Sequence, residues 1–145
     1  MKDQNDLNEE IKSALKAGDG DKRVALTMLK AEALNEAIAK GKKAEGLNSE
    51  EFVSVVKREI RKRKEAREMM ARDPEGQEKE RRAIRMFTDF IPEQMPDEEI
   101  AIMVKAIINS GNTDLKMIMK EAMKQLKGRA DGSKVKEIAE KELGV

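Results

Sequence analysis

The sequence predicts an all-α protein made of two successive helical bundles, about four helices followed by about three. Apolar residues recur at helical spacing along the chain, and no segment alternates with the period of two that indicates a strand. All three prolines and all nine glycines fall between these segments or at their ends, where helices stop. Since two of the prolines, Pro92 and Pro96, lie close together, we place the domain boundary there, giving residues 1–91 and 92–145.

The first two helices are separated by a glycine-containing turn. One helix is expected to run through Leu7 and Leu15 and to end near Gly18, and the next spans about 21–39. Apolar residues cover more than half of the circumference of this second helix. It is therefore expected to lie centrally and to contact neighbours on two sides.

A third helix is expected to begin after Asn48, because Asn48 and Glu51 have the spacing of a capping box. Its apolar stripe consists of Val53, Val56 and Ile60. Lys64 and Arg67 continue that stripe, so the second half of the helix is expected to project beyond the core. A turn at 72–76 then precedes a fourth helix, whose apolar residues are Ala83, Ile84, Phe87, Phe90 and Ile91.

Three shorter helices are expected after the prolines, at about 100–107, 115–126 and 135–143. Tyr and Trp are absent, so aliphatic side chains and methionines must fill both cores. Five methionines are expected to be core residues rather than a binding surface: Met86, Met103, Met117, Met119 and Met123.

The composition argues against catalysis by this chain alone. Zero Cys excludes disulfides and thiolate ligands, and zero His removes the commonest metal ligand and general base. The stretch 18–22 lacks the spacing of a nucleotide-binding loop. We therefore expect no cofactor and no metal. No apolar run approaches the roughly 20 residues that span a bilayer, so we expect no membrane association and a cytoplasmic location.

Charge is concentrated at one place in a chain whose 30 basic and 29 acidic residues nearly cancel. Between residues 57 and 67, seven of eleven residues are cationic and two are anionic. Five of these cations would cover a broad arc of a helix: Lys57, Arg58, Arg61, Lys62 and Lys64. Such an arc can follow the phosphates of an RNA backbone. The alternative is a solvated face whose cations pair with acids of neighbouring helices.

A second candidate site lies in the stretch 127–134. Gly128 is predicted to end one helix in the left-handed conformation, and Asp131 or Ser133 to begin the next. A purely structural turn would explain these residues. In the functional interpretation, the new helix N-terminus is a phosphate seat flanked by Lys127, Arg129, Lys134 and Lys136.

Three elements together, in their order and spacing, resemble the YqeY family. They are the basic stretch 57–67, the segment Phe90-Ile91-Pro92-Glu93-Gln94-Met95, and Gly128-Arg129-Ala130-Asp131-Gly132. The resemblance extends from about Leu7 to Leu143. This family is similar to the C-terminal tail of the GatB subunit of glutamine-dependent aspartyl/glutamyl-tRNA amidotransferase. The resemblance implies a four-helix bundle, a three-helix bundle and a tail that grips tRNA, while amide transfer occurs in a different domain.

Three functional hypotheses follow. The first is a non-catalytic module that binds tRNA or structured RNA by shape and phosphate, since aromatic residues that stack bases are scarce. The second is a protein–protein adaptor whose basic helix docks on an acidic partner. The third, implied by the resemblance, is an accessory component of an amidotransferase, with carbon–nitrogen ligase activity and glutamine as amido donor supplied by catalytic subunits.

Overall fold

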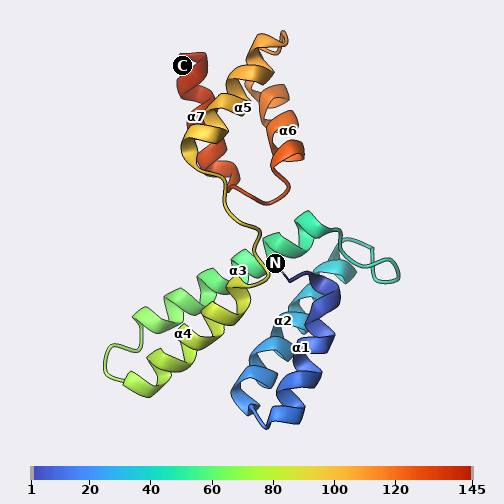
Figure 1. Cartoon of the computed structure of the whole chain (residues 1–145), viewed down its shortest axis with the longest axis vertical. Coiled ribbons are helices and arrows are strands. Elements are labelled where there is room, and N and C mark those ends of the chain that lie inside the picture. Colours follow the sequence, from blue (N-terminus) through green and yellow to red (C-terminus); the bar gives the residue numbers. More distant parts are fainter. Residues whose placement is uncertain (1, 145) are drawn as a thin grey trace. The chain divides into compact units, whose positions relative to one another are not determined.

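A computed structural model describes residues 2–144, and the regular structure of that range is entirely α-helical (Figure 1). The prediction of an all-α fold is therefore confirmed. Seven helices occur in this range: α1 (Gln4–Ala17), α2 (Gly20–Ala39), α3 (Ser49–Glu68), α4 (Pro74–Thr88), α5 (Asp97–Asn109), α6 (Leu115–Leu126) and α7 (Gly132–Leu143). The chain divides into two compact units, Met1–Pro92 with α1 to α4 and Glu93–Val145 with α5 to α7.

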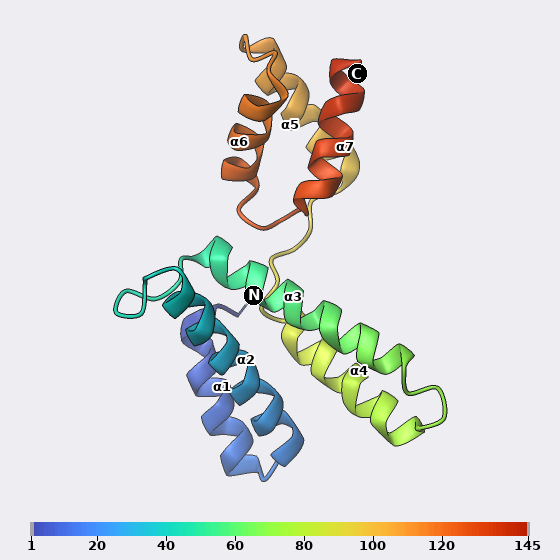
Figure 2. The same ribbon diagram turned by 180° about the vertical axis from the view of Figure 1, so that it is seen from behind.

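The first unit consists of two helical hairpins. Figures 1 and 2 show α1 lying along α2, and α3 lying along α4. α2 contacts both α3 and α4 and so joins the hairpins, as its wide apolar surface predicted. It buries Leu26, Leu29 and Ala33.

The opposite side of α2 differs from expectation. Its apolar residues Val24, Met28, Leu34 and Ile38 are about half exposed. The three neighbouring helices together bury only the arc that carries Leu26, Leu29 and Ala33, so the remaining apolar arc of α2 faces outward.

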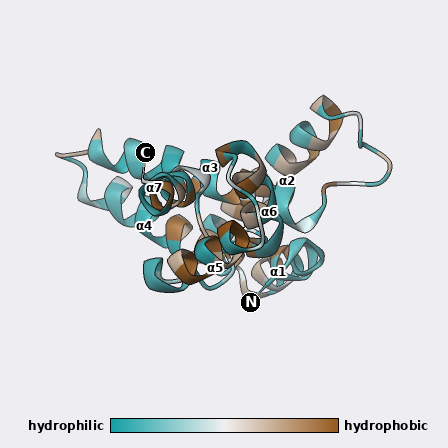
Figure 3. Ribbon diagram, turned by 90° about the horizontal axis from the view of Figure 1, so that it is seen from above, coloured by the Kyte–Doolittle hydropathy of each residue, from teal (hydrophilic) through white to brown (hydrophobic). Residues whose placement is uncertain are grey.

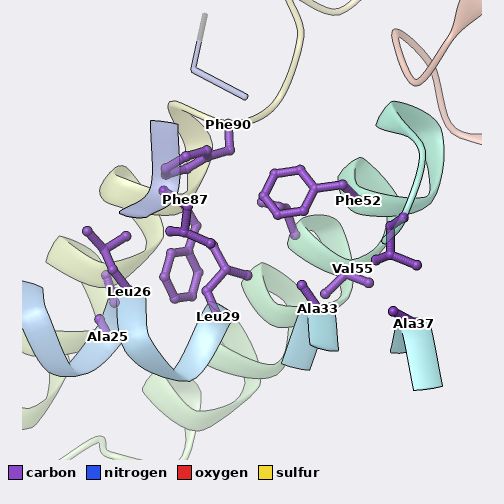
Figure 4. Packing of buried hydrophobic residues seen from close by; sticks show 13 residues of the cluster. Ala25, Leu26, Leu29, Ala33, Ala37, Phe52, Val55, Phe87 and Phe90 are labelled. Atoms are coloured by element: carbon purple, nitrogen blue, oxygen red, sulfur yellow. The ribbon is translucent and has the colours of Figure 1, made fainter. Parts of the chain in front are cut away.

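Aromatic side chains connect the two hairpins in the core of the first unit (Figure 4). Phe52, Phe87 and Phe90 are all buried, and Figure 4 shows Phe87 beside Leu29 of α2. The rings of Phe52 and Phe90 meet edge to face, with centroids 6.0 Å apart and planes at 78°. Aromatic pairs in this geometry stabilise by about 0.5–1.5 kcal/mol beyond the burial of their surface.

Both ends of α4 differ from the sequence-based expectation. Asp73 caps the helix by accepting a hydrogen bond from the backbone N–H of Gly76, so Pro74 is the first helical residue rather than part of a preceding turn. The helix ends at Thr88 instead of near Ile91. Phe90 therefore reaches the core from a tight turn beyond the helix, where its N–H donates to the carbonyl of Phe87.

The predicted capping box at the start of α3 is confirmed. The backbone N–H of Glu51 donates to the Asn48 side chain at 2.8 Å, and the backbone N–H of Asn48 donates to the Glu51 carboxylate at 2.9 Å. This backbone hydrogen bond, followed by Lys42 and Lys40, lowers the pKa of Glu51 to about 2. The Glu51 carboxylate is thus held in its charged form at the entrance to α3.

In the second unit, α5, α6 and α7 each contact the other two. Their shared core contains Ile100, Val104, Ile118, Leu126 and Val135, all of them buried. Met103, Met119 and Met123 pack against this core, and Met86 packs against the first, as predicted. The expectation for Met117 is wrong: its side chain is 49% exposed, because it lines an open groove between α5 and α6.

In the part of the chain that the structure describes, no helix combines the length and the apolar character needed to cross a membrane.

The packing predicts which leucines of α2 stabilise the fold. Leu29→Ala is expected to lower the free energy of unfolding by about 2–5 kcal/mol, because Leu29 is buried among α3 and α4 residues and its truncation leaves a cavity. Leu34→Ala is the matched control, since Leu34 is 49% exposed and should cost less than about 1 kcal/mol. Urea denaturation followed by circular dichroism measures both; equal losses would contradict the packing.

The capping box predicts a pH dependence. Because the folded state lowers the pKa of Glu51 from its ordinary 4.5 to about 2, the stabilisation by its carboxylate is present above pH 4.5 and is lost as pH falls toward 2. Glu51→Gln should therefore be less stable than the parent at pH 7, with the gap closing near pH 2. Glu50→Gln makes the same charge change in the same turn outside the capping box, so an equal pH-dependent gap in that variant would exclude this explanation.

Candidate nucleic-acid interface

α3 carries the predicted basic stretch, and only its first half contributes buried side chains. These are Phe52, Val53, Val55 and Val56. The second half was expected to project beyond the core. α4 instead packs alongside α3, including that second half, so α3 has one side occupied and the opposite side exposed to solvent. The rotation of α3 therefore decides which cations face outward.

Arg63 belongs to the occupied side. Its guanidinium carbon lies 5.4 Å from the centroid of the Phe87 ring, and one guanidinium nitrogen is 3.3 Å from the Glu80 carboxylate of α4. Arg63 thus contacts the core and an acid at once, a cation–π arrangement that stabilises by about 0.5–2 kcal/mol. Sequence reasoning did not assign this role. The available signal was its spacing, since Arg63 follows Val56 by two helical turns on the same face.

Two of the predicted site residues form ion pairs. Arg58 lies 3.1 Å from Glu36 and 3.9 Å from Glu32, both on α2. Lys62 lies 3.3 Å from Glu59 on α3 itself. For these two side chains the structure shows the arrangement of a solvated face with paired charges. The Lys62 pair is the weaker constraint, because exposed pairs at this spacing contribute only about 0.3–0.5 kcal/mol.

The other cations of the prediction share the outward side of α3. Arg61 and Lys64 are exposed, and within residues 2–144 neither has a carboxylate within ion-pair distance. Lys57 is half-buried and precedes them at helical spacing. Positions 57, 61 and 64 fall within an arc of about 60° and along about 10 Å of the helix axis. The structure therefore brings Lys57, Arg61 and Lys64 onto one face, which we call the outward basic face.

The second predicted site is held by backbone contacts to the segment after Pro92. The backbone N–H of Met95 donates to the carbonyl of Arg129 at 2.8 Å, and the Gln94 side chain donates to the carbonyl of Gly128 at 3.3 Å. In return, Nε of Arg129 donates to the carbonyl of Glu93 at 3.3 Å. The segments 93–95 and 128–129 therefore have a structural role, because each provides hydrogen-bond partners for backbone groups of the other.

α6 ends at Leu126, as predicted, but its left-handed cap begins one residue before the predicted Gly128. Lys127 itself adopts the left-handed conformation with φ 49°, and Gly128 follows with φ 84°. Asp131 precedes α7 as its N-cap residue but makes no side-chain capping hydrogen bond there.

The four cations predicted at the phosphate seat have different environments. Lys134 lies 3.0 Å from Asp97, whose hydrogen bond raises the pKa of Lys134. Lys136 lies 3.9 Å from Glu140, and Arg129 contacts the Glu93 carbonyl. Only Lys127 among these four is exposed without a carboxylate partner in the described range. The contacts thus favour a structural turn over a phosphate seat. No cluster of three or more potential metal ligands occurs within residues 2–144.

Fold and surface together define a small, two-unit helical protein with a basic helix face. The family model described as Yqey-like protein matches residues 4–143, nearly the whole chain, and the chain belongs to the YqeY family. No curated protein matches it.

The left-handed Lys127 predicts a stabilising substitution. Lys127→Gly is expected to raise the free energy of unfolding by up to about 1 kcal/mol, because glycine adopts φ 49° without the steric cost that lysine bears. Lys124→Gly removes the same charge one turn earlier, inside α6, and should cost about 1 kcal/mol. Urea denaturation of both variants checks the difference in sign. A loss of stability in Lys127→Gly similar to that of Lys124→Gly would contradict the left-handed assignment.

Proposed function

We propose that this chain is a non-catalytic module that binds tRNA or another structured RNA through the outward basic face of α3. The observation that carries the proposal is the pair Arg61 and Lys64. Both are exposed and lack a carboxylate partner in the described range, while the formal net charge of the whole chain is only +1. A phosphate can bind such a cation without first breaking an ion pair within the protein.

The geometry suits a phosphate backbone rather than bases. Lys57, Arg61 and Lys64 lie along about 10 Å of one helix face, so they can contact neighbouring phosphates of a single strand. The three aromatic residues of the chain, Phe52, Phe87 and Phe90, are buried and therefore offer no surface for stacking bases. Recognition should depend on shape and charge, with little dependence on sequence.

The cations of α3 that are paired with acids of other helices are not part of the outward basic face, but they help to orient it. Arg58 and Arg63 tie α3 to acids of α2 and α4 and thereby hold its rotation. Lys62 can exchange its weak pair with Glu59 for a phosphate and extend the interface. Lys127 is the one cation of the second candidate site that we retain as an RNA contact, since Lys134 and Lys136 are paired.

Membership of the YqeY family supports a role beside tRNA-dependent amide transfer. The resemblance to the GatB tail is a resemblance to a part that grips tRNA while another domain performs the chemistry. Zero His and zero Cys are consistent with a chain that contributes binding. We propose that any carbon–nitrogen ligase activity, with glutamine as amido donor, belongs to catalytic subunits that act with this chain in the cytoplasm.

The salt dependence of tRNA binding tests the proposal. Each neutralised phosphate contributes a slope of roughly −0.7 to −0.9 to log K against log salt concentration, so three cations give about −2 to −3. Arg61→Gln with Lys64→Gln should make the slope about 1.5 less negative and weaken binding at low salt. Fluorescence anisotropy with labelled total tRNA at several salt concentrations measures both quantities.

The matched control is Lys16→Gln with Arg23→Gln, which removes the same two charges from α1 and α2. Both side chains are exposed and have no carboxylate within ion-pair distance in the described range. An unchanged circular dichroism spectrum shows that each variant is folded. If both double variants weaken tRNA binding equally, the attraction is general and the outward basic face is not a site.

A further inference from the structure

The second unit contains an apolar groove between α5 and α6 that the RNA proposal does not use. Its volume is about 830 Å³. The apolar lining consists of Met95, Ile102, Met103, Ala106, Ile107 and Met117. Figure 3 shows hydrophobic residues at several positions of α5 and α6. All the residues that line the groove belong to Glu93–Val145, so it is a feature of the second unit alone.

Large apolar side chains at this groove face solvent. Ile102 on the α5 wall is 68% exposed, and Met117 on the α6 wall is 49% exposed. The core of the unit is complete without them, since Ile100, Val104 and Ile118 are fully buried beneath. The flexible methionine side chains can adapt to a bound surface. The groove therefore offers apolar area that a partner would remove from water.

A row of lysines runs along the α6 side of the groove. Its members are Lys116, Lys120 and Lys124, and Lys120 and Lys124 also line the groove itself. All three are exposed, and none has a carboxylate within ion-pair distance among residues 2–144. At 1.5 Å per residue the row extends over about 12 Å, or about two helical turns. The α6 side of the groove lining carries Glu121 beside Lys120 and Lys124, whereas the α5 side carries Glu99 and no lysine. The α6 edge is therefore net basic and the α5 edge is acidic.

We propose that this groove docks an amphipathic helix of a partner protein that carries acidic residues along one edge. The apolar face of such a helix would lie on Ile102, Met103 and Met117, the usual arrangement when a helix binds a groove. Its acidic edge would meet the lysine row, which also fixes the direction of binding because Glu99 repels acids at the opposite edge. RNA fits this surface less well, because phosphates would leave the apolar lining residues Ile102, Met103 and Met117 in water.

A designed peptide helix of about 15 residues tests the proposal on the full-length chain. The acidic probe has leucines on one face and glutamates along one edge. A basic probe has lysine in place of each glutamate, and a third probe has the acidic composition in scrambled order. Methionine methyl resonances of the labelled protein report the site, because Met103 and Met117 line the groove whereas Met28 lies in the first unit.

The acidic probe is expected to shift the Met103 and Met117 methyl resonances and to leave that of Met28 unchanged. It should bind about tenfold more tightly than the basic probe, given several exposed charge pairs along the row. Lys120→Glu with Lys124→Glu should reverse this preference. Ile102→Ser should weaken the acidic probe without unfolding the unit, since Ile102 is exposed.

Four results would overturn the proposal. The first is an acidic probe that binds no better than the scrambled one up to about 1 mM. The second is a charge preference that survives the double reversal. The third is a tRNA titration that shifts Met117 and is abolished by Lys120→Glu with Lys124→Glu, which would assign the lysine row to RNA. Self-association that fills the groove would likewise assign it to a second copy. Because Arg61 and Lys64 are unchanged in these variants, failure here leaves the α3 proposal standing.

Discussion

The burial of Val55 and Val56 fixes the rotation of α3, and the surface of the first unit depends on that rotation. Both side chains belong to the core shared with α2 and α4. Because a helix repeats every 3.6 residues, burying these two positions also determines the direction of every cation between 57 and 67. Arg63 falls toward α4 and Phe87, and Arg61 falls on the opposite side. A stretch with seven positive charges in eleven residues is thus divided into structural and outward-facing cations.

This division explains how a nearly neutral chain can present a local binding surface. Acids of α2 and α4 neutralise Arg58 and Arg63: the Arg58 pair joins the two hairpins, and the Arg63 pair joins α3 to α4 within one hairpin. The outward face receives no such acids at Arg61 and Lys64. The two units follow the same principle, because the lysine row of α6 also lacks partners while Lys134 on α7 is paired with Asp97. Arg58 and Lys134 are paired across helices, whereas Lys62 and Lys136 are paired within their own helix.

Local signals in the sequence predicted much of the fold. The capping box of Asn48 and Glu51, the left-handed Gly18 and the helical spacing of apolar residues each act within a few residues, so a single sequence contains them. The prediction failed where distant contacts decide. Phe90 continues the apolar helical spacing of α4, so the sequence predicts it in the helix. In the structure α4 ends at Thr88, and Phe90 pairs with Phe52 from the turn that follows. The candidate cations were identified from composition, whereas their partners, such as Glu36 for Arg58, are far away in the chain and invisible to periodicity.

Arginines on opposite sides of α3 should differ in their availability to phosphates. Nuclear magnetic resonance of arginine side-chain Nε–H groups in the full-length chain, during titration with tRNA, compares them directly. We expect the Arg61 resonance to shift and broaden at low salt, while that of Arg63, held by Glu80 and Phe87, stays in place. Equal shifts of both resonances, or shifts at Arg63 alone, would contradict the division of α3 into a paired side and an outward basic face.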